Sequence, residues 1–505
     1  MKYWLGIDIG TGGSRALLVD ASGKVASGVT VAHEDMRMER PLWAEQDPDD
    51  WVRAAFEAIR VALAQAKVSG EDVAGVGFSG QMHGLVLLDA NHQVIRPALI
   101  WCDQRSQQQV DWMNQTAGAG FILEQTANPV LTGFTAPKLL WVRDHDPASY
   151  EQTRTMLLPK DYVRFRLTGD FAQDVSDASG TALYDVVHRR WAAPLISKIG
   201  VDQRILPPVL ESSDLAGEIS EIAAKETGLK KGTPVVAGAG DQAASAVGNG
   251  IVEAGLVSCT IGTSGVVFSH MDEVAYDPAG RVHTFCHAVP GKWHVMGVTQ
   301  GAGLSLQWFR NQLGADFVTR AARENKDAYD LMMAEASSAP ETSEGLYWLP
   351  YLMGERTPHL DAFARGGWIG LTAKHTRAHL LRSMVEGVSY SLKDCLDIVE
   401  SLGIEVRTIR ASGGGAKSPF WRGMLANIFG CPITTLETQE GSAYGAALLA
   451  MSGTGGFSSV PEACAATIRA KDQVEPQPDL VQTYAAGHRA YQALYPALKH
   501  TFRSA

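Results

Sequence analysis

Two short glycine- and threonine-rich segments constrain the fold of this chain more than any other feature. The first is Gly-Ile-Asp-Ile-Gly-Thr-Gly-Gly-Ser-Arg at residues 6–15, and the second is Thr-Ile-Gly-Thr-Ser-Gly-Val at residues 260–266. Each follows or interrupts an apolar, β-rich run, which predicts a tight turn between two strands. Small residues in such a turn let backbone N–H groups and hydroxyls approach phosphate oxygens. One such segment predicts only a turn, but its recurrence indicates two related halves that face one nucleotide.

Length and composition limit the class of protein. A chain of 505 residues exceeds what one hydrophobic core usually serves, so we expect at least two domains. The net charge of −11 argues against nucleic acid or an anionic membrane as a partner, although it does not exclude ATP. Six scattered cysteines without a C-x-x-C pair are typical of reduced thiols. Because no apolar run approaches the ~20 residues of a membrane helix and residues 1–10 do not resemble a secretion signal, we expect a soluble, cytoplasmic protein.

The pattern of predicted elements is the same in both halves. Strands are expected at residues 3–9, 15–19 and 25–31, followed by a helix that Asp47 caps and Pro48 opens. In the second half, strands at 256–260 and 266–270 flank the second glycine segment, and a long helix through 380–396 leads to a strand at 407–411. This order predicts an α/β fold built twice. We place the boundary between the domains so that they span residues 1–246 and 247–505.

Asp241 is the strongest candidate for a catalytic residue. It follows a buried strand that breaks at Gly238 and Gly240, and ligand-contacting side chains gather at such strand ends in open α/β sheets. A carboxylate there could accept the proton of a substrate hydroxyl as that hydroxyl attacks a phosphorus atom. The alternative is that Asp241 only caps a helix beginning at Gln242. The residues alone do not decide between the two interpretations.

Other glycine-rich motifs are less specific. The spacing Gly-x-Gly-x-x-Gly at residues 75–80 fits a dinucleotide-binding fingerprint, but a strand follows it where a helix is required. A similar motif at 238–243 would direct the charge of Asp241 at a pyrophosphate, so we reject both. Three consecutive glycines at 413–415 link a strand to a helix and would let the backbone lie against a ring or a phosphate.

Metal ligands are considered at two places. Asp8, in the first glycine segment, is a carboxylate that can hold Mg²⁺ directly or through water. The sequence His283-x-x-Cys286-His287 suggests zinc, but no further ligand pair stands at a suitable spacing, so we interpret these side chains as packing residues. The motifs of P-loop enzymes and protein kinases are absent from the sequence.

Together these segments resemble the FGGY family of carbohydrate kinases along nearly the whole chain. Residues 133–145 are similar to the first signature of the family, and residues 366–386 are similar to the second. The resemblance implies a fold of the sugar kinase/Hsp70/actin type, with two actin-like, ribonuclease H-like domains around a central cleft. Four further segments, at residues 79–84, 158–162, 176–181 and 354–359, resemble the members that phosphorylate xylulose.

The resemblance also implies roles for individual residues. The N-terminal domain would bind the sugar and the C-terminal domain most of the nucleotide, with Asp241 as the general base and Asp8 as a catalytic carboxylate linked to the metal. The implied sugar contacts are Met82, His83, Asp241 and Gln242. The implied nucleotide contacts are Thr11, Arg15, Thr263, Gly303, Gln307, Gly414 and Gly415. Gly12 and Gly13 replace hydroxyl residues of some relatives, so backbone N–H groups would have to contact the phosphates instead.

The implied activity is the phosphorylation of D-xylulose by ATP in the presence of Mg²⁺. Two alternatives stay open at this point: a kinase for another ketose or polyol, such as ribulose, ribitol or gluconate, and a nucleotide-switched binding protein of the actin or chaperone kind. A small sugar is the expected partner, without nucleic acid or membrane, and the resemblance suggests a homodimer.

Overall fold

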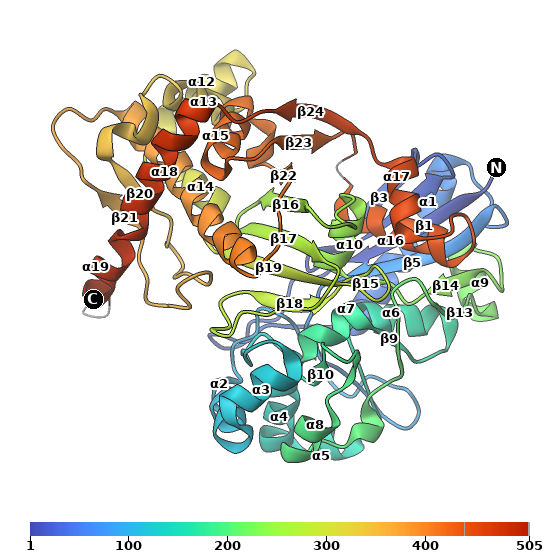
Figure 1. The fold of residues 1–505 in the computed structure, drawn as a ribbon. Helices are drawn as coiled ribbons and strands as arrows, with labels where there is room; N and C mark the ends of the chain where they lie inside the picture. Colours follow the sequence, from blue (N-terminus) through green and yellow to red (C-terminus); the bar gives the residue numbers. More distant parts are fainter. Residues whose placement is uncertain (439, 503–505) are drawn as a thin grey trace.

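The computed structural model describes residues 1–438 and 440–502, which form two α/β units, each built on a seven-stranded mixed sheet (Figure 1). The first sheet has the order β13-β14-β5-β1-β2-β3, with β15 also paired to β5. Its strands are β1 (Tyr3–Ile9), β2 (Gly13–Asp20), β3 (Val25–Ala32), β5 (Val73–Gly80), β13 (Leu215–Glu218), β14 (Pro234–Val236) and β15 (Ala239–Gly240). The expected strands at the start of the chain are therefore confirmed.

The second sheet has the order β18-β19-β17-β16-β22-β23-β24. Its strands are β16 (Leu256–Ile261), β17 (Gly265–Met271), β18 (His283–Cys286), β19 (Trp293–Thr299), β22 (Thr408–Gly413), β23 (Ile433–Leu436) and β24 (Ala470–Val474). Its centre repeats that of the first sheet. β1 pairs antiparallel with β2 and parallel with β5, just as β16 pairs antiparallel with β17 and parallel with β22. The predicted α/β fold built twice is confirmed.

Each glycine segment forms the turn between the first two strands of its sheet. In the first turn the Gly10 N–H donates to the Gly13 carbonyl at 3.0 Å, and in the second the Gly262 N–H donates to the Ser264 carbonyl at 2.9 Å. The sequence repeat is thus a structural repeat. Both turns lie at the carboxyl end of the first strand of their sheet, where ligands bind in folds of this class.

Helices from both halves of the chain cover the first sheet. α1 (Pro48–Ala66) packs on β2 and β3, and Asp47 caps it by accepting the Asp49 N–H at 3.0 Å. α16 (Gly441–Gly453) packs on β1 and β5 and also against α10 (Asp241–Gly248). The approach of α16 is so close that a Cβ atom on Gly6 of β1 would lie 1.9 Å from the Ala443 carbonyl oxygen.

The core behind the first sheet is therefore shared between the two halves of the sequence. Trp4 and Leu17 are buried with residues of α16 and α17 (Val460–Thr467), and the Trp4 indole N–H donates to Thr454 Oγ1 at 2.8 Å. Each sheet takes all its strands from one of the predicted units, 1–246 or 247–505, while residues 441–467 pack across that division. The boundary itself stays a prediction.

The remaining elements form a helical lobe below the first sheet and a second layer around the other sheet (Figure 1). The lobe contains α2 (Gln107–Met113), α3 (Ala119–Thr126), α4 (Thr135–His145), α5 (Pro147–Gln152) and α8 (Ala193–Lys198). Between the lobe and the first sheet, α6 (Pro159–Thr168) packs against β5 and α1, and α7 (Val175–Ala178) packs against β15. Around the second sheet lie α11 (Ala302–Gln312), α13 (Ala328–Ala336), α14 (Arg377–Ser401), α15 (Pro419–Phe429), α18 (Pro478–Gln492) and α19 (Leu494–Phe502). In the described part of the chain, no helix has the length and apolarity needed to cross a membrane.

Candidate active site

Asp241 lies where β15 ends and α10 begins. The N-cap of α10 is Gly240 and Asp241 is the first residue of the helix, so Asp241 does not occupy the N-cap position that the alternative gave it, and its role as the base stays a prediction. Burial first, and then the negative charge of Asp8, raise the pKa of Asp241 to about 7, although hydrogen bonds from Gln242 oppose the rise. A carboxylate that titrates near neutral pH is suited to accept a proton from a sugar hydroxyl.

Asp8 lies on β1, beside Ser79 of β5 and Arg15 of β2. Burial raises the pKa of Asp8, while the neighbouring Ser79 hydroxyl and the charge of Arg15 lower it. The buried Oδ1 atom of Asp8 has no hydrogen-bond partner among the described residues. An orphaned carboxylate oxygen of this kind fits a hard, hydrated cation such as Mg²⁺.

Met82 and His83 follow β5, and Met82 lies next to Gly240. Met82 packs directly on that glycine, since a Cβ atom there would lie 2.9 Å from Met82 Cγ. His83 Nδ1 lies 2.8 Å from the Gly180 carbonyl oxygen, and burial as the largest cause lowers the pKa of His83 to about 3. The ring is therefore neutral, its Nδ1–H donates to Gly180, and its Nε2 is left as an acceptor. A neutral acceptor is what a sugar hydroxyl requires.

Thr11 and Arg15 have protein partners in this structure. Thr11 Oγ1 accepts the Trp101 indole N–H at 2.9 Å and donates to Gln81 Oε1 at 3.3 Å. Arg15 forms an ion pair with Glu440 at 2.5 Å and donates to Thr30 Oγ1 at 2.9 Å. The contacts of Thr11 and Arg15 with phosphate stay predictions.

The other predicted nucleotide residues line one cavity of about 350 Å³ in the second unit. They are Thr263, Gly303, Gln307, Gly414 and Gly415. The second glycine turn is held against the start of α11, because the Gly303 N–H donates to the Gly262 carbonyl at 2.8 Å. The structure thus brings together residues that come from three separate segments of the sequence.

Sequence reasoning missed the apolar walls of this cavity. Tyr329 and Met333 of α13, Leu306 of α11 and Trp421 of α15 line it, and Lys417 adds a positive charge. Aromatic and apolar walls of this kind suit a purine ring. Trp421 follows the triple glycine closely in the sequence, and this could have indicated that it lines the same cavity. Tyr329 and Met333 have the pattern of ordinary core residues of a helix, so nothing in the sequence distinguished them.

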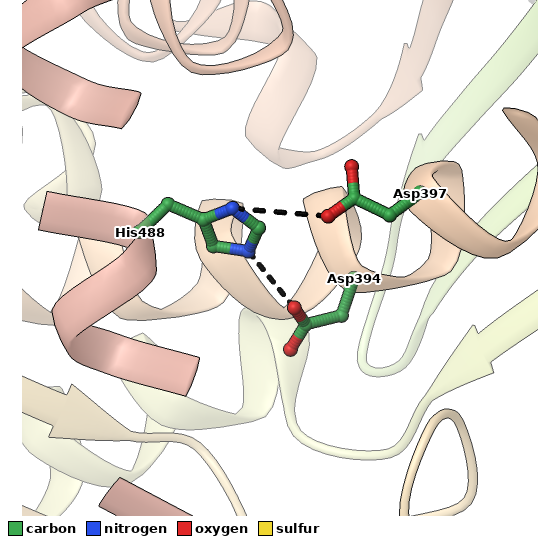
Figure 2. Close-up of side chains that lie close together, drawn as sticks. All are labelled: Asp394, Asp397 and His488. Atoms are coloured by element: carbon green, nitrogen blue, oxygen red, sulfur yellow. Dashed lines mark hydrogen bonds and ion pairs between the residues drawn. The ribbon is translucent and has the colours of Figure 1, made fainter. Parts of the chain in front are cut away.

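Possible metal ligands outside this site either pack in the core or contact one another. His283 and Cys286 are buried in β18, as the packing interpretation predicts. Among the described residues, the set of three ligand side chains that lie close together is Asp394, Asp397 and His488 (Figure 2). His488 Nε2 lies 2.8 Å from Asp394, and the side chains of Gln492 and Lys393 also contact the two carboxylates. These partners make a closed network that joins α18 to α14.

Comparisons with known proteins agree with this geometry. The family model described as the FGGY family of carbohydrate kinases, N-terminal domain, matches residues 3–248, and that of the C-terminal domain matches residues 257–454. The xylulose kinase of Bacillus subtilis (strain 168) is 38% identical over 499 residues, which cover 99% of this chain and 98% of that protein.

Two solved structures from Lactobacillus acidophilus share the fold. A ligand-bound xylulose kinase superimposes with a TM-score of 0.93 at 27% identity, over the whole of both chains. A gluconate kinase superimposes with a TM-score of 0.92 at 26% identity, over 100% of this chain and 99% of the other. The expected two-domain fold of the sugar kinase and actin type is therefore confirmed. Since the two family models together span every candidate site residue, the chain belongs to the FGGY family of carbohydrate kinases.

Proposed function

We propose that this protein transfers the γ-phosphoryl group of ATP to the terminal hydroxyl of D-xylulose, which yields D-xylulose 5-phosphate and ADP. The observation that carries the proposal is the position of Asp241, a half-buried carboxylate with a pKa of about 7 that lies near Asp8 and directly follows Gly240, on which Met82 packs. The full-length similarity to xylulose kinases supports the choice of sugar.

The chemical step follows from that position. The sugar hydroxyl oxygen attacks the γ-phosphorus of ATP, so a new O–P bond forms while the bond from that phosphorus to the ADP oxygen breaks. The hydroxyl proton passes to Asp241, which is ionised for part of the population at neutral pH. Phosphoryl transfer otherwise depends on alignment and on neutralisation of charge, which the two glycine turns provide through their backbone N–H groups.

The sugar would be held by groups that suit a neutral polyol. His83 offers Nε2 as an acceptor, because Nδ1 is committed to the Gly180 carbonyl. Gln242, one residue after the base, offers both a donor and an acceptor. Met82 provides the apolar surface that a carbon chain can contact, and the site needs no positive charge to recognise an uncharged ketose.

ATP would occupy the cavity lined by Thr263, Gly303 and Gln307, with its base between Tyr329 and Trp421. Asp8 would hold Mg²⁺, directly or through water, and the cation supplies charge neutralisation when it is bound. The unpartnered Asp8 oxygen supports this role. A cytoplasmic location and a homodimer are further parts of the proposal, and they rest on the family resemblance.

The test measures ADP release with a coupled assay. The panel of candidate substrates is D-xylulose, D-ribulose, ribitol and gluconate. We expect slow turnover without sugar and a large increase with D-xylulose, because ordering of the cleft around the sugar completes the site and limits attack by water. Equal ADP release with and without every sugar would exclude kinase activity on this panel. A preference for gluconate would move the substrate to the class named by the gluconate kinase relative.

A further inference from the structure

A short segment between the predicted sugar contacts and the base is buried at every position. It comprises Asp174 at the end of β9 (Gln173–Asp174), the short helix α7, and the 3-10 turn η2 (Ser179–Thr181). Its polar residues are all at most 1% exposed: Asp174, Ser176, Asp177, Ser179 and Thr181. Burial of so many polar side chains is unfavourable unless each finds a partner, so the contacts of this segment are informative.

The first contact reaches the residue before Asp241. Ser176 Oγ accepts the Gly240 N–H at 3.1 Å and donates to Asp174 Oδ2 at 2.6 Å. Gly240 is the N-cap of α10, where the chain turns from strand into helix. The Ser176 hydroxyl therefore fixes the peptide group between Ala239 and Gly240, which lies one residue before Asp241.

The second contact reaches the sugar-binding histidine. The Gly180 carbonyl oxygen accepts the His83 Nδ1–H at 2.8 Å. The two residues touch so closely that a Cβ atom on Gly180 would lie 2.5 Å from His83 Cε1 and 3.2 Å from Met82 Cε. Between these two contacts, the Ser179 hydroxyl accepts the Cys286 N–H at 3.0 Å and ties the segment to β18 of the second sheet.

A buried ionic cluster anchors the segment to α6. Lys160 Nζ lies 2.8 Å from Asp174, 2.7 Å from Asp161 and 3.3 Å from Asp177. All four side chains are fully buried. Ser212 Oγ also donates to Asp174 Oδ2, at 3.1 Å, but it makes no side-chain contact with Gly240 among the described residues. Charges paired in a medium of low dielectric constant resist displacement, because any movement leaves one of them unpaired.

We propose that residues 174–181 are the rigid element that sets the base and the sugar-binding histidine relative to each other, and that Ser176 is a positioning residue for Asp241. The proposal rests on the function given above for Asp241 and His83. Its physical basis is that phosphoryl transfer depends on alignment, so a displacement of ~1 Å can lower the rate by roughly 10²-fold.

The test compares Ser176→Ala with Ser212→Ala. Both substitutions remove a fully buried hydroxyl that donates to the same Asp174 oxygen, but only Ser176 contacts Gly240. The sugar used is the member of the panel on which the wild type is active. Calorimetric titration with ATP gives the fraction of protein that binds ATP, and kcat is calculated per ATP-binding site. For Ser176→Ala we expect kcat per ATP-binding site to fall by roughly 10- to 100-fold with ATP affinity unchanged. For Ser212→Ala, kcat should stay within about twofold of wild type.

The pH profile separates positioning from a loss of folded protein. Asp8 on β1 is the charged side chain that acts on Asp241, and Gln242 on α10 hydrogen-bonds to it; both stay unchanged in the variants. If Ser176→Ala lets the strand end relax toward water, the acid limb of kcat/KM moves to lower pH, whereas a smaller folded fraction leaves its shape unaltered. Two results would overturn the proposal. In the first, the pH profile of Ser176→Ala superimposes on that of the wild type and its kcat is within about twofold of the wild-type value. In the second, Ser212→Ala loses as much kcat as Ser176→Ala does.

Two additions keep the test decisive. If Ser176→Ala does not fold, Ser176→Cys fills nearly the same volume with a weak acceptor and should show the same changes at smaller size. A readout that needs no sugar is the pKa of Asp241 itself. It is measured by comparing the melting temperature of a protein that has Asp241 with that of the same protein carrying Asp241→Asn, as the pH is raised. The difference grows until the pH reaches the pKa of Asp241 in the folded protein and is constant above it. That pH should fall in the Ser176→Ala background even if no sugar of the panel is a substrate, and an unchanged value would count against Ser176 alone.

Discussion

The substitution Asp241→Asn should stabilise the protein while it removes activity, and the stabilisation should grow with pH. In the folded protein, burial and the charge of Asp8 raise the pKa of Asp241 from 3.8 to about 7. Asparagine keeps the size of the side chain but carries no charge to be buried. The substitution should therefore remove the unfavourable free energy of burying this charge and raise the free energy of unfolding.

The sign and size follow from proton linkage. Below about pH 4 the carboxyl is protonated in folded and unfolded chains alike, so the two proteins should differ little there. Between pH 3.8 and about 7 the unfolded chain is ionised while the folded chain keeps its proton, so the wild type loses about 1.4 kcal/mol of stability per pH unit. The full range corresponds to about 4 kcal/mol. Because the Asp241 residue is only half-buried, solvent screening reduces this figure, and we expect about 2 kcal/mol above pH 7.

Differential scanning calorimetry in EDTA, without nucleotide, measures the difference. From about pH 5.5 to about pH 8.5, the gain in free energy of unfolding should increase by about 1–2 kcal/mol, which is roughly 2–8 °C in the melting temperature of a unit of this size. Asp89 is a control, since the Gln93 N–H lowers its pKa and Asp89→Asn should not stabilise the protein at any pH. A difference that does not change with pH, or a less stable Asp241→Asn protein, would refute the raised pKa. In the same variant, kcat should fall by ~10²–10⁴-fold.

Three further substitutions test other parts of the site. Gly180→Ala should raise the KM for sugar by roughly tenfold or more with ATP affinity unchanged, because the new methyl group displaces the His83 ring; an unchanged KM would show that this ring is not held by Gly180. Lys160→Met should lower the free energy of unfolding by about 3–5 kcal/mol, since it leaves buried carboxylates without their cation, and a denaturation curve like that of the wild type would contradict this. Gly303→Ala should raise the KM for ATP by roughly tenfold while the KM for sugar changes little, because the new Cβ atom would lie 2.4 Å from the Gly262 carbonyl oxygen. Calorimetric titration with ATP measures the affinity. An affinity equal to that of the wild type would contradict the assignment of this part of the cavity to ATP.

Local features of the sequence predicted the parts of the fold that depend on local physics. The turns at Gly10 and Gly262 were predictable because glycines between two apolar, strand-forming runs allow the tight backbone conformations that a turn requires. The cap at Asp47 was predictable because it needs only a side chain within two residues of the N–H that it accepts. The cavity residues Thr263 and Gly303 were identified through family resemblance rather than through any geometry that the sequence itself contains.

Contacts between distant segments could not be predicted. Arg15 forms an ion pair with Glu440, which is 425 positions away along the chain, and no local pattern around either residue indicates this partner. The packing of α16 on β1 likewise depends on which helix reaches that face of the sheet, and the hydrophobic pattern of α16 alone does not determine its partner. Local propensity determines the elements, whereas such contacts depend on the three-dimensional packing of the whole chain.

The pairing of Asp8 with Asp241 shows how the strand order creates chemistry that neither segment contains. Within the sheet, β5 lies between β1 and β15, and all three run parallel, so their carboxyl ends meet at one edge. Ser79 of β5 is in register with Asp8 on one side and with Ala239 on the other, and the small Ser79 and Gly80 leave room between the two acids. Their mutual repulsion contributes to the raised pKa of Asp241. The topology therefore adds the repulsion of a second carboxylate to the effect of burial, which is the larger cause of the raised pKa of Asp241.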